Sequence, residues 1–280
     1  MIVAPLPGES GGRVSGPRRI ERALEYPVAP GSLPRNVIDA GRYRLRFART
    51  TDDLDQILRL RFAVFNLELG EGLDLAYVSG KDEDEFDARF HHLMIESRDT
   101  GLVVGTYRMQ TAAMAEANGG FYSADEFDLG GVPPDVLARS VELGRACVAR
   151  DHRNGRVLHL LWRGLACYLV WNRLTCLFGC CSLTSQDPRL GRAVLARLVR
   201  ERLLEDRVRV TPLPHTPCDG EEETGPEPEP HIPALFQSYL NLGAKVWGPP
   251  AIDRAFKTID FIVGLDVTAL DPTVLKAFFR

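Results

Sequence analysis

The sequence predicts one α/β domain in which helices flank a mixed, mostly antiparallel sheet. Two observations predict this fold class. Short apolar segments typical of strands recur between residues 43 and 265, and the segments among them have the 3.6-residue spacing of helices. A tight turn joins the first strands, whereas helices separate the later ones, so both antiparallel and parallel pairs are expected.

The first half of the domain begins with a strand at residues 43–48, where apolar side chains alternate with arginine. A helix follows from about Asp52, with Thr50 or Thr51 as its N-cap and an apolar stripe that continues to Leu69. Two strands, at residues 92–97 and 103–110, are joined by the turn Asp99-Thr100-Gly101.

The second half alternates strands with helices. The expected strands lie at residues 141–149, 175–183, 245–247 and 258–265, and the expected helices at 156–172, 187–206 and 234–242. Residues 175–183 are continuously small or apolar, which is typical of a strand buried on both faces. Asp187 and Pro188 are a helix cap and a first-turn proline.

Two tracts lack periodicity. Residues 1–41 are rich in Gly, Pro and Arg without the apolar core of a secretory signal, and residues 207–233 combine prolines with the acidic run Glu221-Glu222-Glu223. The sequence therefore predicts a disordered leader at 1–41 and a single domain at 42–280 with a mobile insertion at about 207–233.

Composition excludes several classes of protein. A net charge of -4 argues against nucleic acid as a partner, and no run approaches the roughly 18 apolar residues of a membrane span. The six cysteines have no C-x-x-C spacing, so neither a disulfide framework nor a metal site is expected. These observations predict a cytoplasmic protein.

The segment between the strand at 141–149 and the helix at 156–172 is a glycine-bearing loop. A helix N-terminus offers unpaired N–H groups and the positive end of the helix dipole, which suits a phosphate. An ordinary basic turn is the alternative.

The pattern Val148-x-x-x-His152-Arg153-x-Gly155-x-Val157 resembles the pyrophosphate-binding motif of the GCN5-related N-acyltransferases. The usual second glycine is absent. The resemblance implies that the phosphate of coenzyme A or of phosphopantetheine is held here, by Val148, Arg153, Asn154, Gly155 and Arg156. It also implies a sheet whose central strands splay apart.

A second segment, FQSYLNLGA at residues 236–244, is similar to the F-x-x-Y-x-x-x-G-[FA] block of the same family. This resemblance implies that Tyr239 protonates the departing thiolate. A tyrosine packed under the sheet is the alternative.

Longer blocks, among them RLRFAVFNLELG (59–70), DEFDARFHHLMI (84–95) and the segment at 142–169, resemble the ornithine N-acyltransferases, also called lyso-ornithine lipid synthases or hemolysin-like proteins. Acyl-homoserine-lactone synthases and N-acyl amino acid synthases are more distantly similar. The resemblance implies transfer of a (3-hydroxy)fatty acyl group from acyl carrier protein to the α-amine of ornithine, the first step of ornithine lipid synthesis.

The same resemblance implies the co-substrates and partners. No cofactor is tightly bound, and the acyl donor is the acyl-phosphopantetheine of acyl carrier protein or acyl-CoA. A lipid product leaves a peripheral contact with the inner membrane open, for which Leu275 and Phe278-Phe279 are candidates; these side chains are alternatively a cover for a sheet edge. Another amine acceptor and a non-catalytic carrier-binding protein are the competing hypotheses.

Arg61 is the first candidate for the substrate side. It shares a helical face with Leu54, Leu58 and Phe65, and a guanidinium in an apolar stripe needs an anion. A clamp for a substrate carboxylate and a carboxylate-paired scaffold are both open. Asp84 and Asp87 are candidate partners of Arg61 or of the acceptor amine, with a solvated acidic patch as the alternative.

Arg108, Glu142 and Arg145 lie on two expected central strands. Glu142 and Arg145 match the family's E-x-x-R, although residues three apart on a regular strand face opposite ways. The family resemblance implies a bulge in this strand, where Gly144 lies between them, which could turn either side chain. Glu142 is the preferred general base, and an ion pair with Arg108 or Arg145 is the alternative. The bulge would also free backbone donors for the thioester carbonyl.

The cysteines predict direct transfer. Cys147, Cys180 and Cys181 lie on expected buried strands, where cysteine packs as a small hydrophobe, so no covalent acyl-enzyme is expected.

Overall fold

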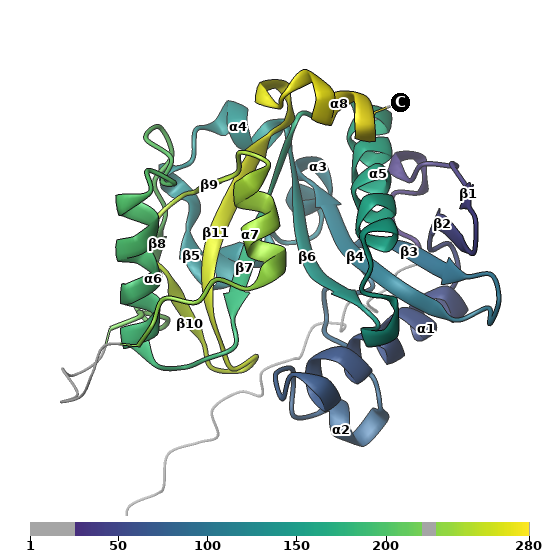
Figure 1. The fold of residues 1–280 in the computed structure, drawn as a ribbon, viewed down its shortest axis with the longest axis horizontal. Helices are drawn as coiled ribbons and strands as arrows, with labels where there is room; N and C mark the ends of the chain where they lie inside the picture. Colours follow the sequence, from purple (N-terminus) through teal and green to yellow (C-terminus); the bar gives the residue numbers. More distant parts are fainter. Residues whose placement is uncertain (1–25, 220–227, 280) are drawn as a thin grey trace, which may run out of the picture.

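The computed structural model describes residues 26–219 and 228–279. Its main sheet has nine strands in the order β1-β2-β3-β4-β6-β7-β11-β10, with β9 pairing β11 as well (Figure 1). Every pair in this sheet is antiparallel except β6 and β7, which are parallel. The predicted fold class, a mostly antiparallel sheet flanked by helices, is confirmed.

The strands of the main sheet are β1 Ile38–Ala40, β2 Tyr43–Phe47, β3 His91–Ser97, β4 Val103–Thr111, β6 Ser140–Val148, β7 Cys176–Leu183, β9 Lys245–Val246, β10 Ala251–Asp253 and β11 Thr258–Asp266. A second, two-stranded sheet consists of β5 Phe127–Asp128 and β8 Thr211–Pro212. The helices are α1 Thr51–Arg61, α2 Ala76–Ser79, α3 Ala112–Ala117, α4 Pro134–Ala138, α5 Gly155–Asn172, α6 Pro188–Arg200, α7 Ala234–Asn241 and α8 Pro272–Phe278.

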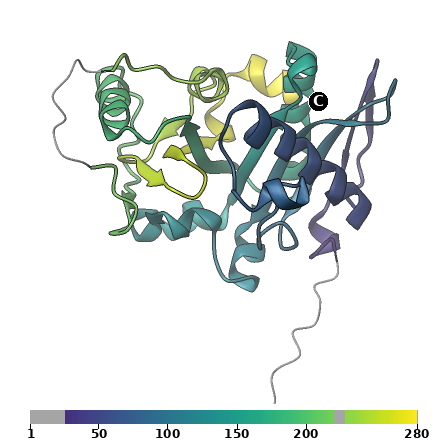
Figure 2. The same cartoon turned by 90° about the horizontal axis from the view of Figure 1, so that it is seen from below.

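The two faces of the main sheet are covered by different helices. Helices α5 and α7 lie on one face, which we call the α5 face, and α1 packs on the opposite α1 face (Figures 1 and 2). Leu160 and Leu165 of α5 join Leu93 in the largest apolar cluster, whereas Ile57 and Leu60 of α1 belong to a separate cluster. Paired strand residues share a face, so register assigns each strand side chain to one side.

Two expected helices end differently. Thr50 caps α1 through the N–H of Asp53, but the α-helix stops at Arg61 and a π-helical segment, η2 Phe62–Glu68, continues the apolar stripe. Helix α6 stops at Arg200 rather than near residue 206, and Arg202 adopts a left-handed backbone there. The apolar pattern predicts where side chains are buried, but a π-turn shares that pattern.

The described part of the expected leader is ordered. Residues 26–41 contain β1, which pairs with β2, and Leu33 is buried in the largest cluster. His91 donates to the carbonyl oxygen of Val28 over 2.7 Å. The packed domain therefore extends at least to Tyr26, and what was expected of residues 1–25 lies outside the described residues.

The described residues of the expected insertion include a packed segment at 208–212. Val208 and Val210 are buried against Phe178 and Trp247, and β8 pairs with β5, so this segment covers the α1 face of β7 and β11. The sequence analysis missed these few apolar contacts because the prolines around them are typical of a loop. The acidic run at 221–223 lies outside the described residues.

The C-terminal aromatics pack on α5. The Phe278 ring lies 5.8 Å from that of Trp162, measured between centroids, so this side chain packs on a helix. Within the described ranges, none of the helices has the length and apolar character that crossing a bilayer requires. The membrane contact stays a prediction.

Candidate active site

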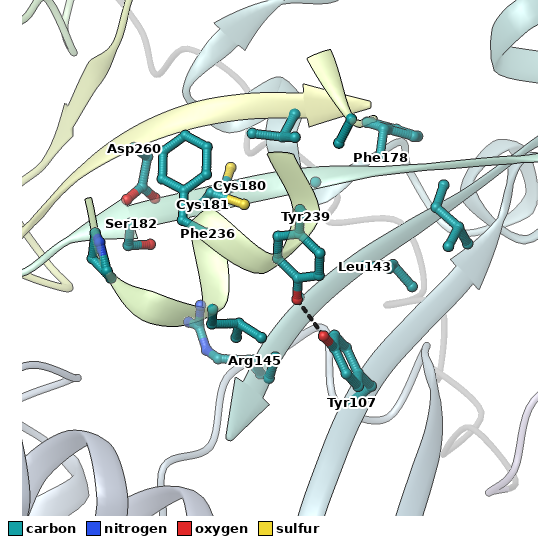
Figure 3. A pocket seen from close by; sticks show the side chains of 18 of the residues that line it. Tyr107, Leu143, Arg145, Phe178, Cys180, Cys181, Ser182, Phe236, Tyr239 and Asp260 are labelled. Carbon is teal, nitrogen blue, oxygen red and sulfur yellow. Dashed lines mark hydrogen bonds between the residues drawn. The ribbon is translucent and has the colours of Figure 1, made fainter. Parts of the chain in front are cut away.

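Strands β6 and β7 separate after four paired residues. Their pairing runs from Ser140↔Cys176 to Leu143↔Gly179, although both strands continue beyond it. A cavity of about 290 Å³ lies where they diverge, between β6, β7, β11 and α7 (Figure 3). The expected splay of the central strands is therefore present, and it opens the sheet itself.

A bulge in β6 sets the direction of the side chains at this opening. The register against β4 shifts so that Arg145 and Ala146 both lie opposite Tyr107, and Arg145 has a φ of 47°. Tyr122 shows the effect: its N–H donates to Glu142, while its hydroxyl lies 3.2 Å from Nη1 of Arg145. The bulge thus brings both members of the E-x-x-R pair to the same face.

A buried arginine–aspartate network lies on the α1 face beside the cavity. Its members are Arg61, Arg108, Arg145, Asp82, Asp84 and Asp87. Arg61 is fully buried, and its Nε lies 2.7 Å from Asp82 while Nη1 lies 2.5 Å from Asp87. This pairing supports the scaffold alternative for Arg61, and Asp82 is a member that the sequence analysis did not single out.

The rest of the network connects to the bulge. Nη1 of Arg108 lies 2.6 Å from Asp84, and Nη2 of Arg145 lies 3.1 Å from the same carboxylate. The three arginines and three aspartates have equal and opposite formal charge. Burial raises the pKa of Asp87, but Arg61 and Arg108 outweigh it and hold that pKa well below the usual value. Of the six, only Arg145 lines the cavity.

Glu142 lies outside the cavity wall and is 1% exposed. Its carboxylate accepts hydrogen bonds from Nε2 of Gln110 (2.7 Å), from the Tyr122 N–H (2.9 Å) and from the N–H and hydroxyl of Ser123 (2.7 and 2.6 Å). Neither Arg108 nor Arg145 is among these donors, so the ion-pair alternative does not describe this carboxylate. Its role as general base stays a prediction, and its position favours fixing the turn at Tyr122.

Tyr239 lines the cavity from α7 on the α5 face. Its hydroxyl is hydrogen bonded to that of Tyr107 on β4, and the two rings point toward one another across the gap (Figure 3). Burial raises the pKa of Tyr239 well above its usual value, so the phenol stays protonated and can donate. This geometry is compatible with the expected proton donor, which stays a prediction.

The expected phosphate loop lies at the start of α5, on the surface and outside the cavity wall. The Asn154 side chain caps the helix by accepting from the N–H groups of Arg156 and Val157. Arg153 is paired with Glu68 over 2.6 Å and also donates to the carbonyl of Val148. Over the described ranges, Arg156 has no ion-pair partner. A phosphate would therefore have to displace Glu68 or Asn154 to gain further donors here.

Four carboxylates at the cavity were missed by the sequence analysis: Glu71, Glu126, Asp253 and Asp260. Glu71, Asp253 and Asp260 line the cavity, whereas Glu126 is not part of its wall and lies beside Asp260. Burial and the neighbouring Asp253 raise the pKa of Asp260 to about 6. A carboxylate within the apolar run at 258–265 was a signal, because a buried charge needs a partner. Nothing in the sequence connects it to Glu126.

Comparison with known proteins gives the family. A family model described as an acetyltransferase (GNAT) domain matches residues 60–163. The L-ornithine N(alpha)-acyltransferase of Agrobacterium fabrum (strain C58) is 32% identical over 244 residues, which are 82% of this chain and 83% of that protein. This chain belongs to the L-ornithine N(alpha)-acyltransferase family.

A second ornithine acyltransferase agrees with this assignment, and a solved AHL synthase is distantly similar. The L-ornithine N(alpha)-acyltransferase of Brucella abortus (strain 2308) is 32% identical over 85% of this chain and 89% of its own length. Among solved structures, the AHL synthase LasI is 13% identical with a TM-score of 0.45, covering 85% of this chain and 94% of its own. The predicted resemblance to the GCN5-related N-acyltransferases and the predicted acyltransferase activity are confirmed.

The cysteines of this family member are unsuited to nucleophilic catalysis. Cys180 and Cys181 both line the cavity, but burial raises the pKa of each thiol, and nearby carboxylates including Asp260 raise it further. A thiol held protonated is a poor nucleophile. The geometry therefore favours direct transfer from thioester to amine.

Proposed function

We propose that this protein transfers a (3-hydroxy)fatty acyl group from acyl carrier protein to the α-amine of ornithine, the first step of ornithine lipid synthesis. The observation that carries the proposal is the cavity between β6 and β7, which has protonated phenols on one face of the sheet and charged groups on the other. The names of the relatives support ornithine as the acceptor.

The donor would enter from the α5 face. A thioester between β6 and β7 lies near the Tyr239 hydroxyl, with its phosphate directed toward the start of α5, where Val148, Arg153, Asn154, Gly155 and Arg156 lie. The carrier's arm has one phosphodiester, which asks less of this loop than the diphosphate of coenzyme A. Exposed Arg150 and Arg156 are suited to an acidic carrier protein.

The acceptor would enter from the α1 face. Arg145 is the arginine of the network that reaches the cavity, and its Nε makes no hydrogen bond among the described residues, its contact with Asp82 being 3.6 Å long. A guanidinium in this state is suited to the carboxylate of an amino acid. Asp84 and Asp87 hold Arg145 and Arg108 in place rather than contacting the acceptor themselves.

The reaction needs orientation and two proton movements. The neutral α-amine attacks the thioester carbonyl carbon, a C–N bond forms, and the C–S bond then breaks. The amine loses a proton, for which Glu142 acting through water is the acceptor predicted from the sequence. Tyr239 supplies a proton to the departing sulfur and later regains one from solvent, while its hydrogen bond to Tyr107 holds the phenol in place.

The test is turnover of purified protein with 3-hydroxyacyl carrier protein and ornithine, with the product identified by mass spectrometry. We expect N-α-acylornithine, and Tyr239→Phe should lower kcat by about 100-fold because the acid is lost. Tyr107→Phe is the matched control and should lower kcat less than tenfold. An acylated product from a different amine, or a lactone, would move the protein to another acceptor class.

Two further arms separate the remaining alternatives. Replacing the carrier substrate with the acyl-CoA of the same chain tests the donor, and kcat/KM should fall at least tenfold. Carrier binding without turnover of any amine, in the wild type and in Glu142→Ala alike, would indicate a non-catalytic carrier-binding protein.

A further inference from the structure

The two sides of the cavity differ in chemistry. Tyr239 and Tyr107 lie on the α5 face, whereas Asp260 pairs with Ser182 and therefore shares the α1 face with Cys180. Figure 3 shows the Asp260 carboxylate turned toward Ser182 at the end of the cavity away from the tyrosines. A charged group of a ligand would therefore meet its partners on the α1 face of the cavity.

Asp260 and Glu126 form a buried pair on that side. Their side-chain oxygens and the Cys180 sulfur lie within 4.8 Å of one another. Asp260 is 4% exposed and Glu126 is 5% exposed, yet apart from the contact between the two carboxyl groups themselves, Oδ1 of Asp260 and Oε2 of Glu126 have no hydrogen-bond donor in the described part of the chain. A buried carboxylate oxygen without a donor is costly, and Asp260 lines the cavity, so a donor from a ligand would relieve it.

We propose that the Glu126–Asp260 pair binds the side-chain ammonium of a diamino-acid acceptor. This inference rests on the proposed ornithine acylation and assigns the residues that select for the second amine. An ammonium has three donors, enough for both unpartnered oxygens. Arg145, on the same side, has the opposite charge and takes the acceptor's carboxylate, so the two ends of ornithine meet complementary groups.

The protonation states of the pair are compatible with reversible binding of a cation. Burial, followed by the charges of Asp260 and Asp253, raises the pKa of Glu126 well above its usual value. Two adjacent buried carboxyl groups therefore share a proton when the cavity is empty of ligand. When the ammonium binds, that proton leaves to solvent and the ammonium takes its place, so the net charge at the pair is unchanged.

The test compares ornithine with norvaline, which has the same carbon chain without the side-chain amine. Wild type should prefer ornithine, and Asp260→Asn and Glu126→Gln should each lower kcat/KM for ornithine about 10- to 100-fold, the loss expected for a charge-assisted hydrogen bond. For norvaline, kcat/KM should change less than threefold. Retained norvaline turnover also shows that each variant folds.

Glu71→Gln is the matched control, because it removes one negative charge from the same cavity wall while Glu71 already accepts the hydroxyl of Thr184. Its ornithine-to-norvaline ratio should stay within threefold of wild type. An equal loss in Glu71→Gln would show a general effect of cavity charge and overturn the assignment, as would an unchanged ratio in Asp260→Asn and Glu126→Gln.

A binding arm keeps the test independent of turnover. Ornithine should raise the Tm of wild type more than norvaline does, and Asp260→Asn should remove this difference. If wild type makes no acylornithine but the Tm difference is present and lost in the variant, the proposed reaction fails and the ammonium site stands. Stoichiometric zinc or manganese in the purified protein, with activity lost in EDTA, would assign the pair to a metal and overturn the ammonium site.

Discussion

The arginine–aspartate network and the Glu126–Asp260 pair are both buried and charged, but only the network balances each negative charge with a positive one. In the network, each carboxylate contacts a guanidinium, and Arg61 contacts two. In the pair, two carboxyl groups meet each other and leave an oxygen on each without a donor in the described chain. Paired buried charges hold a fold together, whereas unpaired ones at a cavity mark a place for a ligand.

The largest effect on stability is expected at Arg61, which pairs with two aspartates of the network. Arg61→Leu should lower the free energy of unfolding by about 3–5 kcal/mol, because Asp82 and Asp87 would stay buried without their nearest cation and would keep only the longer contacts with Arg145 (3.6 Å) and Arg108 (3.2 Å). Urea denaturation measures the change. Arg59→Leu, two residues earlier in an exposed pair with Asp55, should cost less than about 1 kcal/mol. Equal losses for the two variants would show that burial gives the network no special weight.

Arg145 belongs to the network and reaches the cavity, so it should show both behaviours. Arg145→Lys keeps the charge but loses the planar fork, and kcat/KM for ornithine should fall about 10- to 100-fold. For putrescine, which has no carboxylate, the same variant should lose less than threefold relative to wild type. A similar loss for both acceptors would mean that Arg145 acts only by holding the cavity open.

The sequence predicted the paired region better than the unpaired one. Arg61 stands out within an apolar stripe, and the blocks around Asp84, Asp87, Arg108, Glu142 and Arg145 carry the family resemblance. Strand and helix positions followed from periodicity, mostly to within one residue.

The missed features depend on tertiary contacts. Glu126 and Asp260 are 134 positions apart and meet only because the segment before β6 folds over the α1 face of β11. The order of residues 26–41 and 208–212 likewise depends on a few apolar side chains, such as Leu33 and Val210, within tracts whose composition is typical of loops. Local pattern cannot reveal such packing.

The preference for ornithine over norvaline should depend on pH, because the Glu126–Asp260 pair titrates. Because the Asp260 pKa is about 6, its carboxyl group is ionised at pH 7 and mostly protonated at pH 5. The ratio of kcat/KM for ornithine to that for norvaline should therefore fall about tenfold between these pH values, and taking the ratio cancels the shared ionisation of the α-amine.

The groups facing Asp260 are Glu126, Asp253, Glu71, Arg145 and Cys180, and the apparent midpoint belongs to this set. Asp260→Asn should give a ratio that is flat with pH. A wild-type ratio that does not change from pH 5 to pH 7 would contradict the ammonium site.

The smallest expected effect is on stability, where Asp260→Asn and Asp84→Asn should change the free energy of unfolding in opposite directions. The pKa of Asp260 is raised in the folded protein, so the folded state binds more protons than the unfolded state between about pH 4 and pH 6, and stability falls as pH rises through that window. Asp260→Asn should then raise the free energy of unfolding at pH 7 by about 1 kcal/mol, less than the full shift implies, because a buried amide also needs partners.

Asp84 should behave in the opposite way. Burial raises the pKa of Asp84, but Arg108 and Arg145 outweigh that effect and lower it. The ionised carboxylate therefore stabilises the fold at pH values above the unfolded-state pKa, and this stabilisation is lost as pH falls through the folded-state pKa. Asp84→Asn should lower the free energy of unfolding at pH 7 by about 1–2 kcal/mol, measured by urea denaturation beside Asp260→Asn. Destabilisation by both changes would mean that the Asp260 charge is already satisfied in the free protein, which removes the reason for a cation to bind there.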